Sequence, residues 1–273
     1  MTNQVKLSGV RVQHSNHTSL DVIKEVFHRK GCVVVKNVFS ENEINCLQNA
    51  YERAKIAHLK FYDKNNINLS MRERGIIRQI YGYEEIFIES VTKQGITDIV
   101  DSFLEDDWII TQQNGSHVDV QEHKNIDGGG VQVWHRDFVF RHVTTSKPLL
   151  MNILIPLDNF TKENGATNIL PYSHLFPEFP SESFLLKNTE YAEANVGDII
   201  VLNGLTYHAA GQNLSDQNRR SFNTVFAIPA IRHQVDPIPN NCSKEFLERY
   251  EKYLTGGYEN NPTLVNFLRS RNA

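Results

Sequence analysis

The sequence predicts a mainly β fold with flanking helices, in the form of a sandwich or barrel of short strands. Between residues 131 and 230 many short apolar runs alternate with turn signals, such as Asn164-Gly165 and the polar stretch 213–218. Helical periodicity appears only before and after this region, so repeating strand–helix–strand units are disfavoured. We expect residues 1–273 to form a single domain, with a helical N-terminal part (1–127), a β core (128–232) and a helical tail (233–273).

The N-terminal part carries spacing and capping signals for helices. Apolar residues at 20, 22, 23, 26 and 27 predict a helix over 20–30, which Gly31 would end. The apolar run 32–35 then predicts a short buried strand. Ser40 and Glu43 have the spacing of a capping box, so a second helix should begin there and run to about residue 60. A further helix is expected over 89–104.

The β core and the tail complete the expected order of elements. Strands are predicted at 131–140, 149–156, 166–170, 198–202 and 221–228, and an amphipathic helix at 245–254. The polar segment 63–78 and the tail after residue 240 lie outside this core. We therefore expect both to form a lid over the mouth of the barrel, which would exclude water during a reaction.

Composition excludes several classes of protein. The net charge is −4 and no dense run of lysine or arginine occurs, so nucleic-acid binding is not expected. Three scattered cysteines form neither a disulfide framework nor a zinc site, which fits a reducing, cytoplasmic setting. No signal peptide or run of 18 apolar residues is found, so no membrane partner is expected. A small-molecule partner remains, and a homodimer is left open.

His135 and Asp137 are the first candidate metal ligands. They stand two residues apart on an expected strand, so their side chains share one face, while Trp134 and Arg136 point away. Taken alone, a His-x-Asp pair is a weak signal because it often arises by chance. His135 taken alone is more often a core histidine bonded to the backbone.

A distal segment strengthens this signal. His208 lies 73 residues after His135, and Arg219 follows eleven residues later, beyond a turn of polar composition. Two imidazoles and one carboxylate form the facial triad that suits Fe(II) and leaves coordination positions open. Arg219 is expected on the strand next to that of His208, where its planar guanidinium would bind the far carboxylate of 2-oxoglutarate.

Arg219 and Arg220 are adjacent on a strand, so only one of them can enter the barrel. The register with Arg219 inward also turns Ser221 and Asn223 inward, beside the cosubstrate carboxylate. It turns Phe222, Thr224 and Phe226 outward, where the phenylalanines would pack under helices. This register satisfies the polar groups better than the opposite one.

Together these motifs resemble the phytanoyl-CoA dioxygenase family of Fe(II)/2-oxoglutarate-dependent oxygenases. The resemblance covers about residues 20–230, and the matching pieces are 134–137, 163–167 leading to 171–174, Gly197-Asp198, and His208 with Arg219. It implies a double-stranded β-helix (jelly-roll) core, with Fe(II), 2-oxoglutarate and O2. The implied metal ligands are His135, Asp137 and His208, and the implied cosubstrate contacts are Arg219, Gln132 and Thr167, to which the strand register adds Ser221.

Two positions depart from the family pattern. Ala210 stands where members often carry a small hydroxyl residue that holds the cosubstrate, and Tyr172 replaces a common glycine. Gln132 and Thr167 are expected to replace the missing contact, although ordinary strand polarity explains them equally well. His174 belongs to the turn motif and is expected to be structural.

The resemblance implies oxidation of a C–H bond in a small organic molecule, with release of succinate and CO2. Hydroxylation is favoured, with a fainter likeness to enzymes of natural-product biosynthesis. Desaturation, cyclisation or epoxidation by the same cofactors are the nearest alternatives. Halogenation is disfavoured because Asp137 fills the position that a halide would need. A non-catalytic metal-binding jelly-roll protein, or an isomerase or hydrolase on a similar barrel, are alternatives of another class. The substrate pocket is expected to draw on Tyr81, Tyr83, Phe138 and Arg141.

Overall fold

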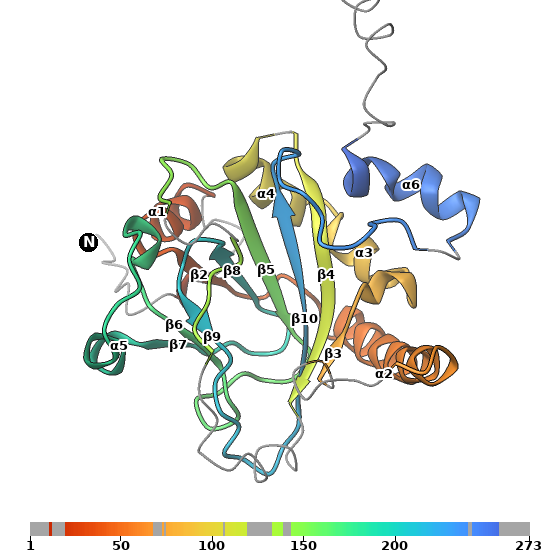
Figure 1. The fold of residues 1–273 in the computed structure, drawn as a ribbon, viewed down its shortest axis with the longest axis horizontal. Coiled ribbons are helices and arrows are strands. Elements are labelled where there is room, and N and C mark those ends of the chain that lie inside the picture. The colour runs from red at the N-terminus through yellow and green to blue at the C-terminus, as the bar shows by residue number, and fades with distance from the viewer. Residues whose placement is uncertain are drawn as a thin grey trace, which may run out of the picture.

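Two β-sheets form the centre of the computed structural model, which describes residues 11–12, 20–67, 73, 75–105, 107–118, 133–138, 143–239 and 242–256. The strands are β1 (Arg11–Val12), β2 (Cys32–Val35), β3 (Ile76–Ile77), β4 (Ile109–Val118), β5 (Leu150–Pro156), β6 (Thr167–Ile169), β7 (Glu190–Ala192), β8 (Ile199–Asn203), β9 (His208–Ala209) and β10 (Arg219–Ala227). The major sheet has the order β1-β2-β8-β5-β10-β4-β3, and the minor sheet the order β7-β6-β9 (Figure 1). Every pairing is antiparallel except that of β1 with β2.

Six α-helices accompany the sheets in the described part of the chain: α1 (Leu20–Lys30), α2 (Glu41–Lys64), α3 (Ile86–Val91), α4 (Ile96–Leu104), α5 (Glu182–Asn188) and α6 (Lys244–Thr255). The predicted capping box is present at α2, where the Glu43 amide donates to Ser40 Oγ over 3.3 Å. This helix runs past its expected end, to Lys64. The helix predicted over 89–104 is instead two helices, because Gly95 adopts a positive φ of 90° between them. None of these helices is long and apolar enough to cross a membrane.

The side chains of β10 alternate between an inner and an outer face of the major sheet. Phe222 and Phe226 belong to the outer core, where their rings meet Phe87 of α3 at 5.0 Å and Trp108 at 5.1 Å. Val225 alternates with them and belongs to an inner cluster on the opposite face. The register predicted for this strand is therefore confirmed.

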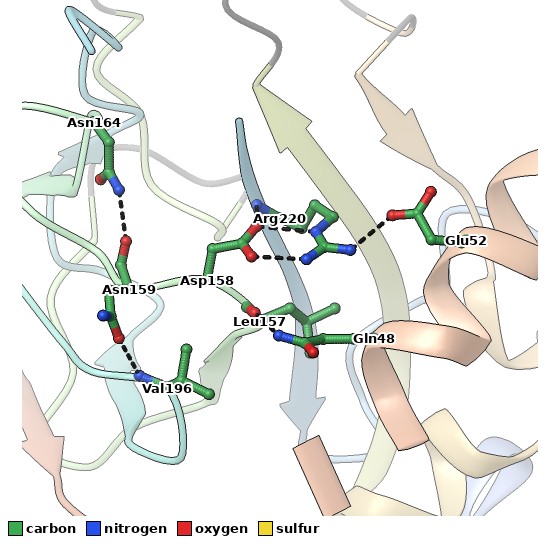
Figure 2. A network of polar contacts seen from close by, with 8 residues as sticks. All are labelled: Gln48, Glu52, Leu157, Asp158, Asn159, Asn164, Val196 and Arg220. Carbon is green, nitrogen blue, oxygen red and sulfur yellow. Dashed lines mark hydrogen bonds and ion pairs between the residues drawn. The ribbon is translucent and has the colours of Figure 1, made fainter. Parts of the chain in front are cut away.

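Arg220 is fastened to the outer surface. Its guanidinium forms two hydrogen bonds with Asp158, at 3.0 and 2.8 Å, and one with Glu52 of α2 at 2.8 Å. Figure 2 shows this network, in which Gln48 of the same helix donates to the Leu157 carbonyl over 2.6 Å. These contacts hold α2 against the ends of β5 and β10.

The expected boundary of the β core at residue 128 is wrong. Strands β2, β3 and β4 precede it, and β4 pairs along its whole length with β10, from Val118 opposite Arg219 to Ile109 opposite Ala227. The strand predicted over 131–140 also differs. Within its described residues, 133–138, only His135 forms a β-bridge, and its partner is His208.

The described part of the tail does not form the expected lid. Helix α6 packs on the outer core beside β4 (Figure 1), where Phe246 stacks on Tyr81 and Tyr253 stacks on Trp108. Tyr81 and Tyr83 therefore belong to this outer layer rather than to a pocket at the metal. Within 63–78, Lys64 ends α2 and β3 pairs with β4, while 68–72 and 74 lie outside the described residues, as do 240–241 and 257–273.

Candidate metal centre

Three predicted ligands meet at one point between the sheets. One ligand atom from each of His135, Asp137 and His208 lies within 4.8 Å of the other two, so the three side chains could hold a single metal ion. The Nε2 atoms of His135 and His208 lie 3.9 and 3.6 Å from Oδ1 of Asp137. His208 and Asp137 are largely buried, while the side chain of His135 is 45% exposed, which leaves one open side.

The minor sheet positions both imidazoles. His208 lies on β9, and the His135 amide donates to the His208 carbonyl over 2.9 Å while the His208 amide donates back over 3.0 Å. Residues paired in this way project their side chains on the same face, and the two rings lie 4.2 Å apart. Asp137, two residues after His135, reaches the same point.

Backbone carbonyls fix which ring nitrogens face the centre. Nδ1 of His135 lies 3.0 Å from the Val133 carbonyl, and Nδ1 of His208 lies 3.0 Å from the Thr206 carbonyl. A carbonyl only accepts, so each Nδ1 carries the proton and each Nε2 presents a lone pair. Burial lowers the pKa of His208, which favours the neutral form that binds metal.

Asn152 supports the carboxylate from the major sheet. Its Nδ2 donates to Oδ2 of Asp137 over 3.0 Å, which leaves Oδ1 turned to the two imidazoles. Asn152 lies on β5 and is buried. This residue was not predicted, although a single asparagine within the apolar strand 150–156 was a signal, because a buried amide needs a partner.

Arg219 has the character of a site for an anion. It is only 4% exposed, its guanidinium lies 4.6 Å from the centre of the Phe160 ring, and neither Nε nor Nη1 has a hydrogen-bond partner. Burial lowers the pKa of Arg219 to about 10, so it remains a cation at neutral pH. A buried cation with two unpartnered nitrogens is unfavourable until an anion binds it, and a carboxylate matches its planar fork.

Of the other predicted cosubstrate contacts, the structure describes Ser221 and Thr167. Ser221 is buried on the inner face of β10, two residues from Arg219. Thr167 is half-buried on β6, on the same face as Ile169, which belongs to a core cluster shared by the two sheets. Their contact with a cosubstrate stays a prediction. Gln132 and Arg141 lie outside the described residues. His174 is structural as expected, with Nε2 2.9 Å from the His28 carbonyl.

A pocket of about 260 Å³ opens beside Asp137. It is lined by Thr111, Gln112, Asp137, Phe138, Leu150, Val225, Ala230, Ile231, Arg232 and Gln234. A larger cavity of about 900 Å³ lies on the surface around residues 170–190, and no triad residue lines it. We therefore assign the smaller pocket to the metal centre, because it alone of these two contains a ligand side chain.

A jelly-roll core that carries two histidines and one carboxylate around a single point defines the class of mononuclear non-haem iron oxygenases. The open side beside His135 and the two unpartnered nitrogens of Arg219 are suited to a bound 2-oxoacid. The chain belongs to the phytanoyl-CoA dioxygenase (PhyH) family, whose model matches residues 27–221. It is an oxidoreductase that depends on Fe(II) and 2-oxoglutarate.

Known proteins resemble the chain in sequence and in fold. The uncharacterized protein Rv1501 of Mycobacterium tuberculosis is 26% identical over 83% of this chain and 82% of its own length. The iron/alpha-ketoglutarate-dependent dioxygenase ausO of Aspergillus calidoustus is 35% identical over 33% of each chain. EctD from S. alaskensis, solved with 2-oxoglutarate and 5-hydroxyectoine, has the same fold with a TM-score of 0.64 and 19% identity. That likeness covers 87% of this chain and 86% of EctD.

Proposed function

We propose that the chain hydroxylates a C–H bond of a small organic molecule in a single domain spanning residues 1–273, with release of succinate and CO2. The observation that carries this proposal is the buried guanidinium of Arg219 with two unpartnered nitrogens on the same inner face as the triad. A protein that only stored metal, or an isomerase on a similar barrel, would not need a buried cation there. The solved complex of EctD contains a hydroxylated small molecule, which favours hydroxylation over desaturation, cyclisation or epoxidation.

Each part of the site has a task in this reaction. His135, Asp137 and His208 would hold Fe(II), and Arg219 would bind the far carboxylate of 2-oxoglutarate, assisted by Ser221. Bound iron and 2-oxoglutarate supply, with O2, an oxidant able to cleave an unactivated C–H bond. Asn152 keeps the Asp137 carboxylate in one orientation, so that its free oxygen remains available to the metal.

The pocket beside Asp137 indicates the chemistry of the substrate. Apolar side chains, those of Phe138, Leu150 and Val225 among them, line much of it. Two of the polar side chains offer donors: Arg232 is a cation, and the Gln112 carbonyl oxygen already accepts from Asn114, which leaves its amide nitrogen to donate. Among the described lining residues Asp137 is the only carboxylate, and it would be committed to iron. We propose a small substrate with an apolar body and an anionic or hydrogen-bond-accepting group.

A substrate screen tests the proposed function. Purified protein would be incubated with Fe(II), ascorbate, 2-oxoglutarate and matched sets of small apolar acids, their methyl esters and amines of equal size. We expect succinate formation and O2 consumption to be stimulated by acids more than by amines, with a product heavier by one oxygen atom. His208→Ala is the control and should form no succinate. Absence of succinate from the wild-type protein under every condition, with or without substrate, would contradict the proposal.

A further inference from the structure

Arg136 stands between two metal ligands but faces away from them. It is 6% exposed, and its Nη2 donates to the Ser173 carbonyl over 2.6 Å and also to the Phe176 carbonyl. Both acceptors belong to the loop that follows β6. Burial of a guanidinium is unfavourable in itself. An apolar side chain could fill this space, but it could not hold the two carbonyls by directed hydrogen bonds as Arg136 does.

The same guanidinium also contacts the neighbour of the third ligand. Its central carbon lies 4.1 Å from the centre of the Tyr207 ring, and Tyr207 directly precedes His208. Phe179 meets the Tyr207 ring edge-on, with ring centres 5.0 Å apart. A cation stacked on an aromatic ring is attracted to it, so Arg136 links the segment of His135 and Asp137 to the segment of His208.

The loop itself is bonded to both segments. The Tyr207 amide donates to Ser173 Oγ over 2.8 Å, and the Leu170 amide donates to the Tyr207 carbonyl over 2.9 Å. Arg136 binds the carbonyl of that same Ser173. Residues 136, 173 and 207 thus form a closed set of contacts, which we call the outer clamp, on the side of the minor sheet opposite the triad.

The segment that needs such support is 133–138. It forms no regular ladder, and the backbone hydrogen bonds that join it to the rest of the described chain are those of His135 with His208 and that of the Phe138 amide with the Gly204 carbonyl at 3.1 Å. Between these two points lies Asp137, whose carboxylate must meet two imidazoles. Because the segment has so few backbone hydrogen bonds, it can rotate unless a side chain anchors it.

We propose that Arg136 is a positioning residue for the iron centre: through the outer clamp it sets the angle at which His135 and Asp137 meet His208. The inference rests on the proposed role of these three residues as iron ligands. Partners that orient metal ligands typically change metal affinity by about 10–100-fold when they are lost. We expect the outer clamp to have an effect in this range, although it lies on the far side of the minor sheet.

The test compares Arg136→Met, Arg136→Lys and, as matched control, Arg220→Met, which removes a well-bonded arginine from the outer surface. The Fe(II) dissociation constant would be measured by anaerobic titration of the metal-free protein. The charge-transfer absorption of the Fe(II)–2-oxoglutarate complex would report the geometry of the centre, and thermal unfolding would report stability. Each readout is independent of a substrate.

We expect Arg136→Met to weaken Fe(II) binding by about 10–100-fold and to shift or broaden the charge-transfer band. The 2-oxoglutarate constant at saturating iron should change much less than the Fe(II) constant, since Arg219 is untouched. Lysine should restore part of the iron affinity, because it can bond one carbonyl but cannot stack a planar fork on Tyr207. Arg220→Met should bind iron as the wild type does.

Wild-type iron affinity and an unchanged band in Arg136→Met would overturn the proposal, whatever the melting temperature. If that variant does not fold, Arg136→Lys and Tyr207→Leu decide, and wild-type iron binding by both would likewise overturn it. Tyr207→Phe keeps the ring and should behave as wild type. A wild-type protein that binds no iron would instead refute the proposed function, so the two failures are distinguishable.

Discussion

The two faces of β10 differ in how their polar groups are satisfied. On the outer face, Arg220 has three hydrogen bonds from its guanidinium to two carboxylates, and phenylalanines pack under helices. On the inner face, Arg219 is more deeply buried and two of its nitrogens have no partner. The two arginines are consecutive residues of β10, and they differ because their side chains point to opposite faces of the sheet. The two unpartnered nitrogens of a buried cation are therefore the feature that marks the inner face as the place where an anionic ligand is expected.

Removal of a triad ligand is expected to have the largest effect on the inner face. His135→Ala, Asp137→Ala and His208→Ala should each abolish iron binding or turnover, because two remaining ligands do not define a facial triad. Metal content and succinate formation would be measured on folded protein, with circular dichroism as the check of folding. A fully active Asp137→Ala enzyme would disprove the assignment of the carboxylate.

The outer face should respond in stability instead. Phe222→Ala removes a fully buried ring that meets Phe87 at 5.0 Å, and should lower the free energy of unfolding by about 3–5 kcal/mol. Denaturant titration measures this loss, and Phe222→Leu should lose much less because volume is better conserved. The folded fraction of either variant should keep the wild-type 2-oxoglutarate constant. A changed constant would mean that the two faces are not independent.

The adjacent arginines sharpen the comparison within one dipeptide. Arg219→Ala should raise the 2-oxoglutarate constant at least about tenfold, since loss of a charge-assisted pair costs about 1.5–3 kcal/mol and 1.4 kcal/mol corresponds to a decade. Arg220→Ala should leave the constant nearly unchanged and reduce stability by at most about 1 kcal/mol, because its ion pairs are partly exposed. Titration of succinate formation against 2-oxoglutarate tests both variants, and the reverse ranking would refute the role of Arg219.

Asn152 offers a finer test of the inner face. Asn152→Leu removes the donor to Asp137 but fills the space, and should weaken Fe(II) binding by about 10–100-fold. Asn203→Leu, on the neighbouring strand β8, is a matched control because it removes a buried asparagine that bonds only a backbone amide in the described structure. Iron titration of the metal-free proteins compares them. Equal loss in both variants would mean that burial, rather than the bond to Asp137, matters.

Local signals explain why much of the fold was predictable. Helix α1 and strand β2 follow directly from apolar spacing and Gly31, and the capping box places the start of α2. The face of β10 could be predicted because Phe222 and Phe226 lie on one face of the strand and Ser221 and Asn223 on the other, and a buried face favours one register. The triad could be predicted because the His-x-Asp spacing and the distance from His208 to Arg219 are properties of the sequence alone.

Tertiary contacts explain what was missed. Strand β4 carries the polar run 111–114, in which the Thr111 hydroxyl donates to the Val225 carbonyl and the Gln113 amide to the Phe87 carbonyl, and both partners are distant in sequence. The irregular path of 133–138 depends on bonds to His208 and Gly204, which no local pattern encodes. The position of α6 on the outer core depends on Trp108 and Tyr81, far away in sequence.

The pairing of β4 with β10 joins residues 109–118 to residues 219–227, about a hundred positions later in the chain. Contacts between residues so far apart in sequence form slowly, because the entropy of closing a long loop is lost before any hydrogen bond between the strands offsets it. During synthesis β10 leaves the ribosome after both sheets' other strands and after His208. A nascent chain can therefore bring its three metal ligands together before the strand that carries Arg219 is available. The metal site would then form before the 2-oxoglutarate site during folding.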